Sequence, residues 1–317
     1  MKGAEGKSPL LVLAGPTATG KSALALTLAR RFGLEIITAD SAQVYRGLDI
    51  GTAKPTPAER EAVPHHLIDL VDPDEDYSVA DYQRDAYRAI AQQLARGKLP
   101  FLVGGTGLYI RAVTRGYAFG KKGKNEALRE ELAREAREEG LEALYQRLLK
   151  LDPKAAQKIH PRDQRRIIRA LEVHMLEGRP ISRQVEETAA HEPAFTPVLF
   201  ALNYPRPLLY RRIEERVEAM LQAGFLAEVK GLLERGYKPD CPGLQILGYR
   251  QLVQYLQGAV GWEETVAEIK KQTRHLAKRQ LTWFKSEPQI TWLEVTGSSG
   301  LEAAAEIISN KVKEIWP

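Results

Sequence analysis

Short apolar runs alternate with amphipathic segments along the first part of the chain. The runs at 10–14, 34–38 and 100–103 are continuous and brief, which is typical of buried strands. Apolar residues recur at helical spacing near 21–31 and 79–96. Strands that alternate with helices predict a parallel sheet flanked by helices, so the expected fold class is α/β. Ligands of such sheets bind beyond the carboxyl ends of the strands.

The pattern changes from about residue 117. A basic stretch at 120–124 predicts a joint, and the residues after it predict helices that break at Gly140 and at Asp152-Pro153. Strand-like residues return at 198–202. We therefore expect two domains: an α/β core with C-terminal helices from residues 1–116 and 196–317, and an all-helical insertion domain from residues 117–195.

The first predicted strand leads through a glycine-rich loop into the first predicted helix. Residues 15–22 read GPTATGKS, which matches the G-x-x-x-x-G-K-[ST] pattern of a P-loop. Backbone N–H groups of such a loop turn toward an anionic oxygen, and the helix N-terminus adds positive potential. Lys21 would neutralise phosphate charge, and the Ser22 hydroxyl would hold Mg²⁺. The residues expected to bind phosphate are Gly15, Pro16, Thr17, Ala18, Thr19, Gly20, Lys21 and Ser22.

Two further polar features follow strands at the same expected sheet edge. Asp40 comes after the second strand, where a carboxylate could bind Mg²⁺ through water, act as a general base or cap a turn. The third strand ends in the glycine-rich residues 104–107 rather than in the acidic residue with which P-loop NTPases hold Mg²⁺. Asp69 is a possible substitute that follows a Pro-His-His turn. The sequence therefore gives little support to ATP hydrolysis.

Cations gather in two places. The first set, spaced to fall on one face of a helix, consists of Arg162, Arg165, Arg166 and Arg169. Such a stripe suits an anionic ligand, or a solvated face paired with acids from neighbouring helices. The second set lies within 269–285, which has no Asp or Glu but contains Trp283 and Phe284. Cations interleaved with aromatic residues suit the backbone and unstacked bases of RNA, although these two aromatics could also belong to a core.

The composition is that of an ordinary soluble protein. The chain has 317 residues, 44% of them hydrophobic and 27% charged, and a formal net charge of +5. No segment reads as a secretion signal or a membrane span, so we expect no membrane partner. A single cysteine, Cys241, excludes an internal disulfide and fits a reducing, cytoplasmic location. The protein is expected to act as a monomer.

The motifs together resemble those of the tRNA dimethylallyltransferase (isopentenyltransferase) family. They follow the family order over nearly the whole chain, and the long string at 40–55 is far more specific than the P-loop alone. The matching segments are residues 15–22 (GPTATGKS), 40–55 (DSAQVYRGLDIGTAKP), 104–109 (GGTGLY), 169–173 (RALEV), 212–216 (RIEER), 248–250 (GYR) and 278–283 (KRQLTW). The start of the insertion departs from the family, because a basic stretch stands where a Pro- and Asp-containing segment is expected.

This resemblance implies an activity. A dimethylallyl group would pass from dimethylallyl diphosphate to N6 of adenosine 37 in tRNA, with Mg²⁺ as cofactor. The P-loop would hold the diphosphate of the donor rather than ATP, which accounts for the missing acidic residue. The insertion would grip the anticodon stem-loop, and the adenine would be flipped out to meet the donor. No Cys/His set for a structural zinc follows the last helix, as in bacterial members.

The resemblance also implies residue roles. Asp40 would accept the proton of N6, while Lys21, Thr17 and Arg212 would stabilise charge on the leaving diphosphate. Thr106 would contact the tRNA at the channel mouth. The residues expected along the RNA path are Asp40, Ser41, Ala42, Gln43, Thr106, Arg129, Arg165, Arg166, Ile167, Ile168, Arg169, Gln245, Ile246, Leu247, Gly248, Tyr249, Arg250, Lys278, Arg279, Gln280, Thr282, Trp283 and Lys285.

Three other functions remain open from the sequence. A P-loop ATP-dependent small-molecule kinase would use the same loop for ATP and Asp40 as its base, and would not need the basic clusters. An adenylate prenyltransferase would share the loop and the base but take free AMP. An RNA-binding module would leave Asp40 and Arg212 without a role.

Overall fold

A six-stranded parallel sheet forms the centre of the larger part of the chain. The computed structural model describes residues 7–119, 123–190 and 192–317. The strand order is β3-β2-β4-β1-β5-β6. The strands are β1 (Pro9–Ala14), β2 (Ile36–Ala39), β3 (His65–His66), β4 (Phe101–Gly104), β5 (Thr196–Asn203) and β6 (Ile290–Glu294). The expected α/β fold class is confirmed.

The strands differ from the predicted ones mainly at the sheet edges. β2 begins at Ile36 and runs through Ala39, so it is shifted from the expected 34–38. The edge strands β3 and β6 were not expected. β3 is two histidines long and has no apolar run to mark it, and β6 alternates between half-buried and exposed positions. An edge strand is held by one neighbour, so its own sequence carries a weaker signal.

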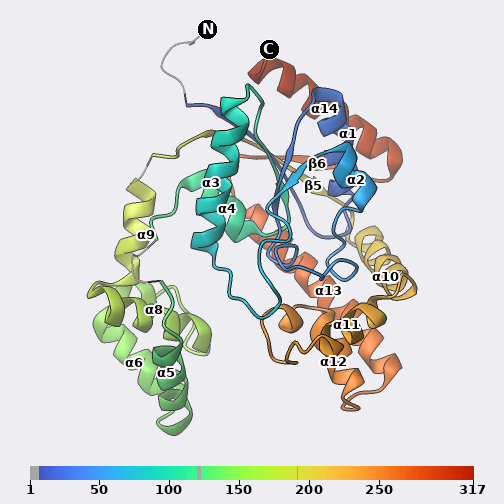
Figure 1. The fold of residues 1–317 in the computed structure, drawn as a ribbon. Helices are drawn as coiled ribbons and strands as arrows, with labels where there is room; N and C mark the ends of the chain where they lie inside the picture. The colour runs from blue at the N-terminus through green and yellow to red at the C-terminus, as the bar shows by residue number, and fades with distance from the viewer. Residues whose placement is uncertain (1–6, 120–122, 191) are drawn as a thin grey trace. The chain divides into compact units, whose positions relative to one another are not determined.

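Helices cover both faces of the sheet (Figure 1). Side chains alternate along β1, so Leu11 and Leu13 join the core under α1 and α14, whereas Leu10 and Val12 join the core under α3 and α4. The helices of this part are α1 (Lys21–Phe32), α2 (Pro57–Ala62), α3 (Val79–Ala95), α4 (Gly107–Arg115), α10 (Arg206–Gln222), α11 (Phe225–Glu234), the 3₁₀ turn η1 (Gly243–Gln245), α12 (Tyr249–Leu256), α13 (Trp262–Lys285) and α14 (Ser298–Ile315).

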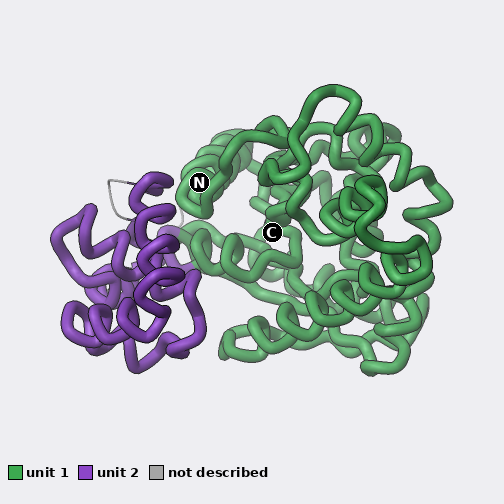
Figure 2. Tube along the Cα trace, turned by 90° about the horizontal axis from the view of Figure 1, so that it is seen from below, with its two compact units in different colours: residues 1–114, 195–317 green, residues 115–194 purple. Residues whose placement is uncertain are grey.

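The chain divides into two compact units (Figure 2). Unit 1 comprises residues 1–114 and 195–317, and unit 2 comprises residues 115–194. The described elements of unit 2 after α4 are all helical: α5 (Glu126–Glu138), α6 (Leu141–Leu151), α7 (Pro153–Ala156), α8 (Gln164–Glu177) and α9 (Ile181–Ala190). Its helices break at Gly140 and Asp152, where the sequence predicted breaks. The basic stretch expected as a joint at 120–124 lies largely outside the described residues.

Within the described ranges, no helix combines the length and apolar character that crossing a membrane requires.

Candidate active site

The register of the sheet brings three loops to one edge. Ala14 of β1 pairs with Gly104 of β4, and Gly104 also pairs with Ala39 of β2. The P-loop, Asp40 and Gly105 therefore start side by side at the carboxyl ends of their strands. A side chain at position 104 would run into the backbone of Ala39, so glycine is required for this close approach.

The N-terminus of α1, at the end of the P-loop, has no side-chain cap. α1 begins after Gly20, which has a φ of 86° and provides no side-chain hydrogen bond to the helix. The Thr19 hydroxyl and Lys21 Nζ both donate to the carbonyl of Pro16 at 2.9 Å, which closes the loop on itself. The hydroxyl of Ser22 is exposed in the first turn and makes no hydrogen bond to another described residue. The N-terminus of α1 is thus prepared for an anion.

Lys21, Asp40 and Arg216 share one electrostatic environment. Burial is the main reason why the pKa of Lys21 falls from 10.5 to about 8; the charge of Arg216 lowers it further, and Asp40 opposes the shift. Burial also lowers the pKa of Arg216, and Asp40 again favours the charged form. Two cations beside one carboxylate leave positive charge that a bound anion would balance.

Helix α10 supplies two arginines, one helical turn apart. Arg212 Nε donates to the carbonyl of Ala18 in the P-loop at 2.8 Å, and its guanidinium lies 5.2 Å from the ring centroid of Tyr204. Arg216 lies on the same helix face, four residues on. Arg212 was expected at the site from the sequence and Arg216 was not, although their i, i+4 spacing indicated both. Both arginines line a pocket of about 400 Å³. The lining residues are Ala18, Thr19, Gly20, Lys21, Ser22, Ala23, Arg212, Glu215, Arg216 and Ala219.

Asp40 is fixed by a turn at the end of β2. Its Oδ1 accepts a hydrogen bond from the N–H of Ala42 at 2.9 Å. The Thr106 hydroxyl accepts from the N–H of Ser41 at 3.0 Å and so ties the loop after β4 to the loop after β2. The capping role considered for Asp40 is therefore present. Its other carboxylate oxygen makes no hydrogen bond to a described residue and is left for a ligand or a proton.

Asp69 does not replace the missing metal-binding acid. Its carboxylate contacts Lys54 Nζ at 2.5 Å and Arg60 Nη1 at 2.7 Å. Lys54 is itself buried and also bonds to Asp49. Because both carboxylate oxygens of Asp69 form ion pairs, this carboxylate stabilises the loop around it and is not available to a metal ion.

The 41–55 segment is held in place by a carboxylate of α11. Glu228 accepts hydrogen bonds from the N–H groups of Asp49 and Ile50 at 3.0 and 2.8 Å, and from the Tyr249 hydroxyl at 2.5 Å. The segment also closes on itself, because the Gln43 amide donates to two carbonyls within it. Glu228 was not expected from the sequence, because the backbone donors that it accepts from lie more than a hundred residues away along the chain.

The cations of α13 fall into two groups. Lys270, Lys271 and Arg274 form ion pairs with Glu218, Glu268 and Glu214, which partly neutralise their charge. A second group is exposed and makes no ion pair with a described residue; it consists of Lys278, Arg279 and Lys285. We call these three residues the α13 cations.

Two other side chains of α13 contact the sheet edge. The Gln280 amide bonds to the P-loop and to the loop after β4, and Trp283 packs on Gly107 with the Arg111 guanidinium 4.2 Å from its ring centroid. Phe284 is fully buried in the core, as the alternative interpretation of this residue predicted. Thr282 is exposed and donates to a carbonyl of its own helix.

The residues expected at 245–250 are divided between core and surface. Gly248 and Tyr249 are buried, and the half-buried Ile246 and Leu247 pack against the same core. The side chain of Tyr249 is fully enclosed and bonded to Glu228, so it cannot contact RNA in this arrangement. Gln245 and Arg250 remain exposed.

Helix α8 of unit 2 presents fewer cations than its spacing predicted. Arg162 precedes the helix, so the stripe lacks its first member. Ile167 and Ile168 are buried in the core of unit 2 and cannot contact RNA as they stand. Arg165 and Arg166 are exposed.

The remaining arginines of the expected RNA path in unit 2 serve a buried carboxylate. Arg129 and Arg169 both bond to Glu172, which has no exposed surface. Burial alone would raise the pKa of Glu172, but the hydrogen bonds from Arg129, from the N–H of Asn125 and from Arg169 lower it. Arg129 therefore has a structural partner that its sequence position did not suggest.

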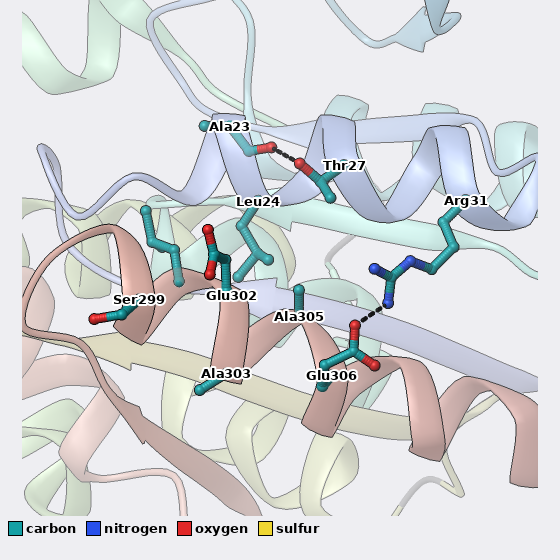
Figure 3. Close-up of a pocket in the computed structure, with 10 residues that line it drawn as sticks. Ala23, Leu24, Thr27, Arg31, Ser299, Glu302, Ala303, Ala305 and Glu306 are labelled. Carbon is teal, nitrogen blue, oxygen red and sulfur yellow. Dashed lines mark hydrogen bonds and ion pairs between the residues drawn. The ribbon is translucent and has the colours of Figure 1, made fainter.

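A pocket of about 530 Å³ lies between α1 and α14 (Figure 3). Ala23 and Leu24 of α1 and Ala305 of α14 give it an apolar wall, and the ion pair between Arg31 and Glu306 closes one side at 2.6 Å. None of the residues predicted to bind a ligand lines it.

The donor set beside α1 suits Mg²⁺. Among the described residues there is no group of three or more His, Cys, Asp or Glu side chains that could enclose a metal. Mg²⁺ however binds through one or two protein oxygens, waters and phosphate oxygens. The unbonded hydroxyl of Ser22 at the uncapped end of α1, with a free oxygen of Asp40 at the same sheet edge, fits that mode.

Comparison with known proteins gives consistent matches over most of the chain. Residues 43–287 match the IPP transferase family, and residues 9–70 match the isopentenyl transferase family. The tRNA dimethylallyltransferase of Symbiobacterium thermophilum is 50% identical over 98% of this chain and 97% of its own length. That of Moorella thermoacetica is also 50% identical, over 95% of this chain and 94% of its own length.

Solved structures agree with these matches. The tRNA isopentenylpyrophosphate transferase of Bacillus halodurans is 42% identical, covers 98% of both chains and superposes with a TM-score of 0.71. A eukaryotic dimethylallyltransferase acting on tRNA is 29% identical, with a TM-score of 0.82, over 98% of this chain and 80% of the other.

Proposed function

The chain belongs to the IPP transferase family and has the activity of a tRNA dimethylallyltransferase, and from this premise we propose the donor, the target atom and the residues that act. The donor is dimethylallyl diphosphate, and the acceptor is N6 of adenosine 37 beside the anticodon. The observation that carries the proposal is the convergence of Lys21, Asp40 and Arg216 beside the uncapped N-terminus of α1.

The diphosphate binds where the protein offers positive charge and free donors. Backbone N–H groups at the start of α1 donate hydrogen bonds to the diphosphate oxygens, and Lys21 and Arg216 neutralise the charge of the diphosphate. Arg212, bonded to the P-loop carbonyl of Ala18, supports the loop from the other side. Mg²⁺ held by Ser22 would supply further charge stabilisation of the diphosphate.

Transfer replaces a carbon–oxygen bond by a carbon–nitrogen bond. The allylic C1–O bond breaks, and its electron pair leaves with the diphosphate, whose developing charge Lys21 and Arg216 stabilise. The N6 lone pair forms the new bond to C1. The free carboxylate oxygen of Asp40 accepts the proton that N6 loses. The products are N6-(dimethylallyl)adenosine and diphosphate.

The tRNA is proposed to lie along the α13 cations, with Thr106 near the target base. The α13 cations are exposed and make no ion pair with a described residue, so they are available to bind the phosphate groups of RNA. In unit 2, the exposed Arg165 and Arg166 suit the same partner. The kinase alternative has no support, because the family is one of prenyltransferases and Asp69 is engaged in ion pairs.

Nucleoside mass spectrometry tests the donor and the target. The purified protein is incubated with Mg²⁺, unmodified tRNA and dimethylallyl diphosphate, and the tRNA is then digested and mapped. We expect one adenosine, at position 37, to gain one C5H8 unit. A matched tRNA with guanosine at position 37, and a reaction with ATP instead of the prenyl donor, should give no product. A mass gain at another position would refute the target, and ATP turnover with unmodified tRNA would favour the kinase.

A further inference from the structure

Gln280 of α13 is hydrogen-bonded at both ends of its side-chain amide. Its Oε1 accepts from the N–H of Thr17 in the P-loop at 2.9 Å, and its Nε2 donates to the carbonyl of Gly105 at 3.0 Å. Thr17 follows β1 and Gly105 follows β4. One side chain therefore joins two loops of the sheet edge that no backbone hydrogen bond of the described residues joins directly.

The loop after β4 is shaped to admit α13. A Cβ at Gly105 would lie 2.5 Å from Gln280 Nε2, and a Cβ at Gly107 would overlap the ring of Trp283. Glycine at both positions lets the helix approach the loop backbone closely. The hydrogen bonds of Gln280 therefore depend on the close packing of α13 against the P-loop and against the loop after β4.

Gln280 lies on the same helix as the proposed RNA surface, but it faces the sheet edge whereas the α13 cations face solvent. Two of the α13 cations, Lys278 and Arg279, directly precede it, and Lys285 follows within the same helix. The neighbouring turns thus carry the charges proposed to bind RNA, while Gln280 bonds to the loop proposed to bind the diphosphate. Because the N–H of Thr17 donates a hydrogen bond to Gln280, it is not available to bind dimethylallyl diphosphate.

We propose that Gln280 is a positioning residue that sets the P-loop relative to the loop after β4 and thereby couples RNA bound on α13 to the diphosphate site. This inference rests on the proposed function. RNA bound to the α13 cations would hold this helix, and with it Gln280, against Thr17 and keep the P-loop in the conformation that binds diphosphate. By thermodynamic reciprocity, bound diphosphate must then strengthen RNA binding by the same factor.

The test compares three variants of the full chain. Gln280→Met removes both hydrogen bonds at similar side-chain length, whereas Gln280→Glu keeps an acceptor for Thr17 and loses the donor to Gly105. Gln272→Met is the matched control, because Gln272 lies on the same helix and bonds only to Glu268 within it. The dissociation constant of Mg²⁺-diphosphate is measured with and without an unmodified anticodon stem-loop, together with kcat and KM for transfer.

We expect RNA to tighten diphosphate binding several-fold in the natural chain and in Gln272→Met. In Gln280→Met, the ratio of the diphosphate dissociation constants without and with RNA should fall toward one. The kcat for transfer should fall about tenfold, because one or two hydrogen bonds are lost. RNA affinity without diphosphate should stay within about twofold, because the α13 cations are untouched. Gln280→Glu should give an intermediate factor.

Three results would overturn the inference. The first is an absence of coupling in the natural chain, and the second is unchanged coupling and kcat in Gln280→Met. The third is a loss of RNA affinity alone, which would make Gln280 an ordinary RNA contact. If Gln280→Met fails to fold, as judged by thermal melting, the same readouts on Gln280→Glu decide. Failure of the natural chain to prenylate tRNA would refute the proposed function, while diphosphate affinity would still report on the loop.

Discussion

Asp40 illustrates how one carboxylate can serve structure and chemistry together. Its Oδ1 caps the turn at Ala42, which orients the group, and its other oxygen makes no hydrogen bond to a described residue. A carboxylate held in one orientation loses little freedom when it accepts a proton from a bound base. The two interpretations left open by the sequence, turn cap and general base, are therefore compatible.

Asp40→Asn separates these two roles. The asparagine Oδ1 can still accept from Ala42, so the fold should keep its melting temperature, whereas the neutral amide cannot take up the N6 proton. We expect the single-turnover rate of transfer to fall by roughly 10²–10⁴-fold, the usual contribution of a general base. Affinity for tRNA should be unchanged in a filter-binding assay. A rate within about threefold of the natural chain would exclude Asp40 as the base.

Lys21 gives the site a dependence on pH. Burial and the charge of Arg216 lower its pKa to about 8, with Asp40 opposing, so the free protein carries this charge below pH 8 and loses it above. A bound anion favours protonated Lys21 and raises its pKa. Affinity for Mg²⁺-diphosphate should therefore be level up to about pH 8 and fall above it, as measured by calorimetry. Lys21→Arg stays charged and should show a much flatter profile between pH 8 and 9.5; equal profiles would contradict the assignment.

At the scale of elements, helices far along the chain hold the loops of the sheet edge. Helix α10 contacts the P-loop through Arg212, α13 through Gln280, and α11 supports the segment after Asp40 through Glu228. Each contact joins a side chain to backbone groups of a loop. The C-terminal helices thus act as a frame for the loops of the N-terminal strands.

Glu228→Gln tests this support. The amide keeps one acceptor oxygen but loses the charge that strengthens the bonds from Asp49, Ile50 and Tyr249. We expect the free energy of unfolding in urea to decrease by about 2 kcal/mol. Glu234→Gln on the same helix is the control, because its ion pair with Lys230 is exposed and should contribute less than about 0.5 kcal/mol. Equal losses in the two variants would contradict the supporting role.

At the scale of the whole molecule, the modest net charge of +5 hides an uneven distribution. Several cations form ion pairs, which reduces their contribution to the electrostatic field outside the protein; Arg129 and Arg169, for example, share the carboxylate of Glu172. The α13 cations face solvent without a described partner. Attraction of a polyanion therefore depends on a few positions rather than on composition.

The double variant Lys278→Ala, Arg279→Ala should weaken tRNA binding and reduce its salt dependence. Losing two phosphate contacts lowers the slope of log K against log salt by about one to two. The matched double variant Lys270→Ala, Lys271→Ala removes ion-paired cations of the same helix and should change the slope much less. Titrations at several salt concentrations measure both. A fall in donor affinity alone, or equal slopes in the two variants, would remove α13 from the RNA surface.

Local features of this chain were predictable because they depend on neighbours in sequence. The apolar runs predicted the four inner strands of the sheet, glycine and Lys21 marked the P-loop, and Asp152-Pro153 marked a break between helices. The edge strand β6 was not predicted, because only one of its five residues is buried. The spacing of the α8 arginines did not reveal that Arg169 forms an ion pair with Glu172 of the same helix.

By itself, the sequence determined the α/β class, the P-loop and the presence of Asp40 at a strand end, since each follows from a short stretch of residues. Only the tertiary structure decided that Arg216 faces Lys21, that Lys270 is paired with Glu218 while the α13 cations are unpaired, and that Gln280 spans two loops. The partners in these contacts come from distant parts of the chain; Gln280 and Thr17 are 263 positions apart. Packing of the helices on the sheet brings them together, and no periodicity within either segment encodes that meeting.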